Sequence, residues 1–130
     1  MGLSSYIWTH VYLRSYFFFK QMKHILFDLI DCPSELLDNE EHIRMSLYVA
    51  AKVSNSELLN INAHKFKPQG VTGLAMLADS HISIHTWPEK NIAKCDIFTC
   101  GEKCLPELAV QYLTEAFKAA ETTSQEYERI

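Results

Sequence analysis

The chain has 130 residues, of which 48% are hydrophobic and 22% are charged, and its formal net charge is −4. This length is typical of a single domain that buries a core without metals or disulfides, and the composition excludes a disordered or collagen-like chain. Nucleic-acid binding is not expected either, because phosphate contacts need clustered Lys and Arg, which the sequence lacks. No stretch is long and apolar enough to predict a membrane span.

The first 21 residues differ from the rest of the chain, since they are rich in aromatic side chains and contain no Asp or Glu. Arg14 interrupts their apolar run and Phe18-Phe19-Lys20-Gln21 ends it, which does not fit a secretory signal. A membrane-surface helix would need more Lys and Arg on its polar face. We favour an N-terminal extension of unknown role, or a start codon assigned too far upstream, with the domain spanning residues 22–130.

The hydrophobic pattern of a folded domain begins at Met22. Residues 22–31 alternate with an apolar excess, which predicts a mostly buried strand. Ser34 is followed by acidic residues, a typical helix start, and the apolar spacing beyond it predicts a helix over about 34–53. Residues 58–66 then return to the alternation of a strand.

Three further strands are predicted in quick succession, over 73–78, 81–87 and 93–99. The segments between them are short enough for antiparallel hairpins. Pro106 begins a last helix with an apolar face that continues to Ala120, whereas the tail 121–130 is too short for a prediction. This order predicts an α+β fold, a two-layer sandwich in which an antiparallel sheet carries helices on one face.

The four cysteines, Cys32, Cys95, Cys100 and Cys104, are not followed by histidines at zinc-finger spacing, so we expect no metal site. Without a secretory signal, they are expected to be reduced thiols of a cytoplasmic protein. Cys95 lies in an apolar strand, where burial as a small hydrophobic residue explains it. Cys100 ends that strand, at a place where a thiol can meet a cleft.

The densest polar chemistry lies in Asp79-Ser80-His81-Ile82-Ser83-Ile84-His85, with Cys100 downstream. A hydroxyl, imidazoles and a thiol are the groups used in nucleophilic and acid–base catalysis. The alternative is that His81, Ser83 and His85 are only the polar face of a half-exposed strand. No hydrolase nucleophile motif, phosphate-binding loop or H-E-x-x-H occurs. The pattern by itself leaves both interpretations open.

Three motifs in order are Gly70-Val71-Thr72-Gly73, the segment 78–89 (ADSHISIHTWPE) and Asp96-Ile97-Phe98-Thr99-Cys100-Gly101. In sequence and spacing they resemble the small prokaryotic S-adenosylmethionine decarboxylases, which are pyruvoyl-dependent enzymes of polyamine synthesis. The resemblance extends from Met22 to about Ala120 and does not include residues 1–21.

The resemblance implies that Ser80 attacks the carbonyl of Asp79, that the amide shifts to an ester, and that the chain is cut between these two residues. Ser80 then becomes a pyruvoyl group at the start of the C-terminal fragment. This cofactor forms a Schiff base with the substrate amine and accepts electrons when carbon dioxide leaves. The family usually has Glu before the serine, so Asp79 is expected to change the rate of cleavage rather than to prevent it.

The resemblance also implies roles for neighbouring residues. His85 corresponds to the histidine that transfers protons during self-processing, and Thr72 to a hydroxyl, commonly Ser, that assists it. Cys100 corresponds to the cysteine that reprotonates the substrate α-carbon. Phe66 and Glu89 resemble the residues that stack on adenine and bind the ribose hydroxyls. The implied assembly is a homodimer of cleaved protomers, in which Phe66 and Glu89 of one protomer approach His85, Cys100 and the processed serine of the other.

Three functions follow from these expectations. The leading one is decarboxylation of S-adenosylmethionine to the aminopropyl donor for spermidine synthesis. A pyruvoyl-dependent decarboxylase of ornithine or arginine is the second, although it would not need the adenine and ribose contacts of Phe66 and Glu89. The third is an unprocessed regulatory homologue, which would not need Ser80, His85 and Cys100 together.

Overall fold

The structure is a computed structural model that describes residues 22–129, so the expected extension over 1–21 lies outside the described residues. The elements in chain order are β1 (Met22–Ile30), α2 (Ser34–Leu37), α3 (Glu40–Val53), β2 (Leu58–Lys65), β3 (Val71–Leu77), β4 (His81–Trp87), the 3-10 helix η1 (Pro88–Lys90), β5 (Ile92–Thr99), α4 (Pro106–Ala116) and β6 (Glu121–Arg129).

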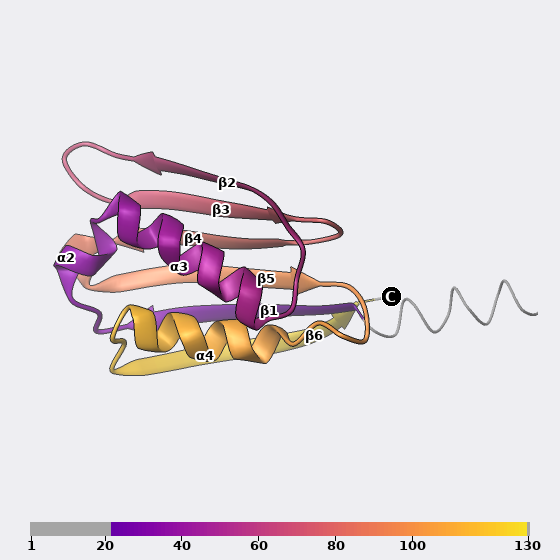
Figure 1. Cartoon of the computed structure of the whole chain (residues 1–130). Helices are drawn as coiled ribbons and strands as arrows, with labels where there is room; N and C mark the ends of the chain where they lie inside the picture. The colour runs from indigo at the N-terminus through magenta and orange to yellow at the C-terminus, as the bar shows by residue number, and fades with distance from the viewer. Residues whose placement is uncertain (1–21, 130) are drawn as a thin grey trace, which may run out of the picture.

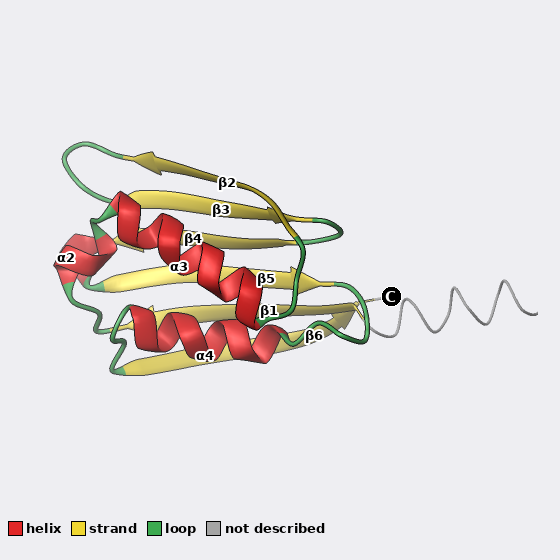
Figure 2. Ribbon diagram, in the orientation of Figure 1, coloured by secondary structure: helices red, strands yellow, loops and turns green. Residues whose placement is uncertain are grey.

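The six strands form one antiparallel sheet in the order β2-β3-β4-β5-β1-β6. Helices α3 and α4 lie on the same face of this sheet (Figures 1 and 2). The predicted α+β two-layer sandwich is therefore confirmed. Within residues 22–129 no helix covers the opposite face, which we call the open face of the sheet. No helix in this part of the chain is long and apolar enough to cross a membrane.

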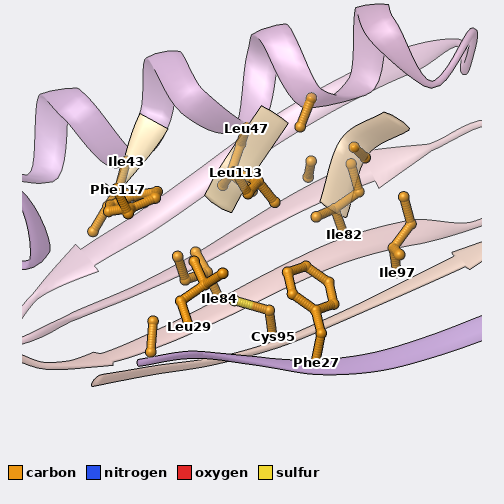
Figure 3. Packing of buried hydrophobic residues seen from close by; sticks show 14 of the residues in the cluster. Phe27, Leu29, Ile43, Leu47, Ile82, Ile84, Cys95, Ile97, Leu113 and Phe117 are labelled. Atoms are coloured by element: carbon orange, nitrogen blue, oxygen red, sulfur yellow. The ribbon is translucent and has the colours of Figure 1, made fainter. Parts of the chain in front are cut away.

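The core lies between the sheet and the two long helices, as Figure 3 shows. Alternate residues of β1, β4 and β5 are buried there because successive side chains of a strand point to opposite faces. Helix α3 contributes Ile43 and Leu47, and α4 contributes Leu113, followed by the buried Phe117 at its end. The same alternation places the other side chains of each strand on the open face.

The helix predicted over 34–53 is interrupted, because Asp38 and Asn39 separate α2 from α3. The Asp38 carboxylate accepts hydrogen bonds from Lys65 Nζ at 2.6 Å and from the Gly70 backbone N–H at 2.8 Å. These two bonds hold the pKa of Asp38 below its usual range. Asn39 caps α3 by accepting from the backbone N–H of His42. The break is therefore tied to the end of β2 and to the loop that follows it, which are distant in the sequence.

The tail, for which the sequence supported no prediction, forms the edge strand β6 and pairs with β1 along its whole length. Its side chains are mostly exposed, so it carries no apolar alternation that could reveal a strand. The preceding helix ends at Ala116, not near Ala120, because the chain turns at Lys118 with a positive φ of 50°. This turn reverses the chain so that it can run back beside β1.

Candidate active site

The polar segment between β3 and β5 adopts the conformation that its alternation predicts. Ile82 and Ile84 are fully buried beneath the helices, while His81, Ser83 and His85 lie on the open face. The two interpretations of this segment are therefore compatible, because the candidate catalytic side chains are also the polar face of a strand. Their function depends on what surrounds each of them.

The Asp79-Ser80 peptide lies in the tight turn between β3 and β4, at one end of the sheet. The Leu77 backbone N–H donates to the Ser80 carbonyl at 3.0 Å, which closes the turn. Cys100, just after β5, donates from its thiol to the Asp79 carbonyl oxygen at 3.4 Å. Asp79, Ser80 and Cys100 also line one pocket together with Cys104. Three of the predicted site residues thus meet at this end.

The Cys100 thiol is suited to donating a proton. Burial raises its pKa above the usual cysteine range, and the nearby Asp79 carboxylate and Cys104 sulfur add to the effect. The group is therefore a thiol at neutral pH. Cys95, in contrast, is almost fully buried among core residues, as the sequence predicts, and burial raises its pKa as well. Exposure to the pocket distinguishes Cys100 from this structural cysteine.

A second pocket, of about 380 Å³, lies at the opposite end of β3 and β4. Its lining includes Phe66, Thr72, His85 and Glu89, which the sequence predicted, and also Trp87, which it did not single out. Thr72 Oγ1 and His85 Nδ1 are 3.0 Å apart, so the hydroxyl and the imidazole are hydrogen-bonded across the two strands. This end therefore combines a polar pair with aromatic side chains and a carboxylate.

The two pockets are separate within one chain. A strand advances about 3.3 Å per residue, so the five residues from Ser80 to His85 span roughly 16 Å. Contrary to the expected grouping, the structure does not bring His85 to Ser80 and Cys100 of the same protomer. It places His85 and Thr72 with Phe66 and Glu89 instead. Sequence proximity was misleading here because β4 is extended and runs from one end of the sheet to the other.

A third group of polar side chains, which the sequence analysis missed, lies on the open face beside the Ser80 end. Asp96 Oδ2 is 2.6 Å from His24 Nε2 and 2.7 Å from His81 Nε2, and Ser83 donates to the other carboxylate oxygen. We call these four residues the His–Asp cluster. Burial alone would raise the pKa of Asp96, but the hydrogen bonds from Ser83, His24 and His81 outweigh it and lower the pKa. The carboxylate is therefore ionised at neutral pH.

Comparisons with known proteins, together with the two-layer fold, assign the chain to the decarboxylases. A family model described as S-adenosylmethionine decarboxylase matches residues 23–130. The S-adenosylmethionine decarboxylase proenzyme of Prochlorococcus marinus (strain MIT 9211) is 52% identical over 97 residues, which are 75% of this chain and 80% of that protein. The proenzyme of Methanococcus aeolicus is 48% identical over 98 residues, which are 75% of this chain and 84% of that protein.

The same relationship is found among solved structures. The crystal structure of the adenosylmethionine decarboxylase from Aquifex aeolicus superposes with a TM-score of 0.78 at 36% identity, and the match covers 85% of this chain and 91% of that one. The chain therefore belongs to the S-adenosylmethionine decarboxylase family and is a carboxy-lyase.

Proposed function

We propose that the chain cuts itself between Asp79 and Ser80, and that the processed enzyme decarboxylates S-adenosylmethionine to the aminopropyl donor for spermidine synthesis. The observation that carries this proposal is the hydrogen bond from the Cys100 thiol to the Asp79 carbonyl oxygen. A donor at this oxygen draws electrons from the carbonyl carbon, which makes attack by the adjacent hydroxyl easier. The donor thus lies at the bond that self-cleavage must break.

Self-cleavage would convert the Asp79-Ser80 peptide bond into an ester and then break that ester. Ser80 Oγ adds to the Asp79 carbonyl carbon, the C–N bond breaks, and the nitrogen takes the proton from the hydroxyl. A base then removes the α-proton of residue 80 and its Cβ–O bond breaks, which releases Asp79 as a free carboxylate and leaves a dehydroalanine at position 80. Water then replaces its nitrogen, which leaves as ammonia, and the residue becomes a pyruvoyl group. Ser80 is in a turn at a pocket, where the product would be accessible to a substrate.

The pyruvoyl group would supply a carbonyl that condenses with the substrate amine and withdraws the electron pair left by carbon dioxide. Cys100 lies beside this position, and its raised pKa keeps the thiol protonated at neutral pH. It is therefore placed to give a proton to the α-carbon after decarboxylation. Phe66 and Trp87 offer flat faces for a purine, and the carboxylate of Glu89 can accept hydrogen bonds from ribose hydroxyls. These groups favour a nucleoside substrate over ornithine or arginine.

The two pockets are combined if two protomers pair through their open faces. Large apolar side chains are exposed on this face, as expected of a surface that another protein covers: Leu26, Leu74, Met76 and Tyr127. A two-fold axis that reverses the strand direction would place the Ser80 end of one protomer over the His85 end of its partner. We therefore propose a homodimer whose sites each combine Ser80 and Cys100 of one chain with Phe66, Thr72, His85 and Glu89 of the other.

The four cysteines are free, which fits a reducing compartment, and we place the enzyme in the cytoplasm on this basis.

The mass of the denatured protein tests the cleavage. Two fragments that split between Asp79 and Ser80 are expected, and a carbonyl-trapping hydrazine should shift the mass of the smaller one. Ser80→Ala should remain uncut, while Ser56→Ala, which removes a hydroxyl from the same pocket, should be cut. A wild-type chain that stays intact after long incubation would refute the proposal.

Complementation tests the shared site. Ser80→Ala and His85→Ala should each be uncut as homodimers, but co-expression forms mixed dimers in which one site is intact. Random pairing makes about half of the dimers mixed, so about a quarter of all chains should be cut, all of them carrying the His85→Ala change. Absence of cleavage in co-purified mixed dimers would show that both residues must belong to the same chain.

A further inference from the structure

We infer that the His–Asp cluster is a binding site for a divalent transition-metal ion, with His24 Nε2, His81 Nε2 and one oxygen of Asp96 as ligands. These three atoms lie within 4.8 Å of one another, and each comes from a different strand. No role in the proposed decarboxylation has been assigned to them. The inference does not rest on the proposed function.

The cluster is built by the register of three neighbouring strands. Phe98 of β5 pairs with His24 of β1 on one side and with His81 of β4 on the other. Asp96 is two residues earlier on β5, so its side chain emerges on the same open face between the two histidines. The Phe98 ring packs against both imidazoles, with centroids 5.6 and 6.2 Å away. Strands and packed rings hold side chains more accurately than loops do.

The chemistry of the donor set fits a borderline metal ion. Two imidazole nitrogens and one carboxylate oxygen form a common set for Zn²⁺ and other first-row divalent ions, with water at the remaining positions. Ligand bonds of about 2.0–2.1 Å place tetrahedral ligand atoms roughly 3.3 Å apart, so each histidine nitrogen needs to move away from Asp96 Oδ2 by less than about 1 Å. Ser83 already holds the second carboxylate oxygen, as hydrogen bonds do for carboxylates that bind metals.

Solvent reaches the ligands in the isolated protomer, before the proposed dimer covers this face, since the exposed side-chain fractions are 20% for His24, 38% for His81 and 20% for Asp96. His81 directly follows Ser80 and begins β4. A metal ion would therefore tie the start of β4 to β1 and β5. Such a link would hold the start of β4 in place even when the Asp79-Ser80 bond before it is broken.

Cobalt titration tests the site, because Co²⁺ has visible absorption that depends on its ligands. Protein without an affinity tag is freed of metal with a chelator and equilibrated overnight with Co²⁺, since the proposed dimer covers this face. One ion per chain is expected, with bands of nitrogen and oxygen ligation and without the near-ultraviolet band of thiolate ligation. Zn²⁺ should displace it.

Variants then identify the ligands. His24→Gln and His81→Gln keep an amide that can donate to Asp96 but remove the imidazole nitrogen, so each should weaken Co²⁺ binding at least about a hundredfold. His64→Gln and Cys104→Ser change a histidine and a thiol outside the cluster, and both should bind as the wild type does. Thermal unfolding confirms that each variant is folded.

The inference is overturned if folded wild-type protein binds no Co²⁺, or if both glutamine variants bind it unchanged. Thiolate absorption that disappears in Cys104→Ser would also overturn it, by assigning the ion to the pocket that Cys100 and Cys104 line. Ser80→Ala should bind Co²⁺ normally, which separates this result from any failure of self-cleavage.

Discussion

Gly73 lies where strand β3 passes close to helix α3, and Gly73→Ala tests how tightly the two elements pack. A β-carbon at this residue would lie 2.8 Å from Ile43 Cγ2, 2.9 Å from Leu47 Cδ1 and 3.1 Å from Ile84 Cγ2, whereas ordinary contacts begin near 3.4 Å. The Leu47 methyl is at the end of a flexible side chain and can turn aside. Ile43 Cγ2 is attached to a branched β-carbon, which is held by the helix, so α3 itself must move.

Whether Gly73→Ala raises or lowers the free energy of unfolding depends on two opposing contributions, backbone entropy and steric overlap. Alanine loses less backbone entropy than glycine on folding, which by itself would stabilise the variant by about 0.5–1 kcal/mol. Forcing a methyl group into a packed core costs about 1–3 kcal/mol. Since α3 would need to shift by about 0.6 Å at Ile43, we expect the steric cost to prevail and the free energy of unfolding to fall by about 1 kcal/mol or more.

Urea and thermal unfolding followed by circular dichroism measure this change. A loss of about 1 kcal/mol lowers the melting temperature of a domain of this size by roughly 4 °C. The double variant Gly73→Ala with Ile43→Ala should lose less stability than the two single changes added together, because the contacting methyl group is gone. A Gly73→Ala protein that is as stable as the wild type, or more so, would show that α3 accommodates the methyl group without loss of packing.

Three further outcomes are expected. Asp38→Asn should lower stability at neutral pH by at most about 1 kcal/mol, because the Asp38–Lys65 pair is partly exposed and screened. The folded-state pKa of Asp38 is lowered, so this stabilisation is present above the usual Asp pKa and is lost as pH falls through the folded value. Unfolding curves of variant and wild type should therefore converge in acid, and a constant difference would contradict the assignment. Cys100→Ser should still be cut, because a hydroxyl can donate to the same carbonyl, but kcat should fall at least about a hundredfold since a serine hydroxyl is a poor proton donor. Cys104→Ser is its matched control, and equal losses in both variants would argue against a proton donor at position 100. Glu89→Gln should raise KM about tenfold or more through a lost charged hydrogen bond, and a fall in kcat with unchanged KM would exclude that role.

Local pattern was sufficient for most elements of this fold. In β4 and β5 every second residue is buried, and in α3 the buried residues recur at helical spacing. The type of each element can therefore be predicted from its own residues. The break at Asp38 was not predictable in this way, because the groups that bind its carboxylate are distant in the sequence, at the end of β2 and in the loop that follows it. Strand β6 was not predicted, because the side chains of this edge strand are mostly exposed and its sequence therefore lacks the apolar alternation that identifies a strand.

The motifs that contain Ser80, His85 and Cys100 can be recognised without a structure, and they make these side chains candidates for chemistry. The folded structure shows which of them lie together. It separated His85 from Ser80 along an extended strand, and it brought His24 and Asp96 together from positions 72 residues apart. Side-chain periodicity is a local property and can be seen in the sequence, whereas strand order and register depend on packing of the whole chain.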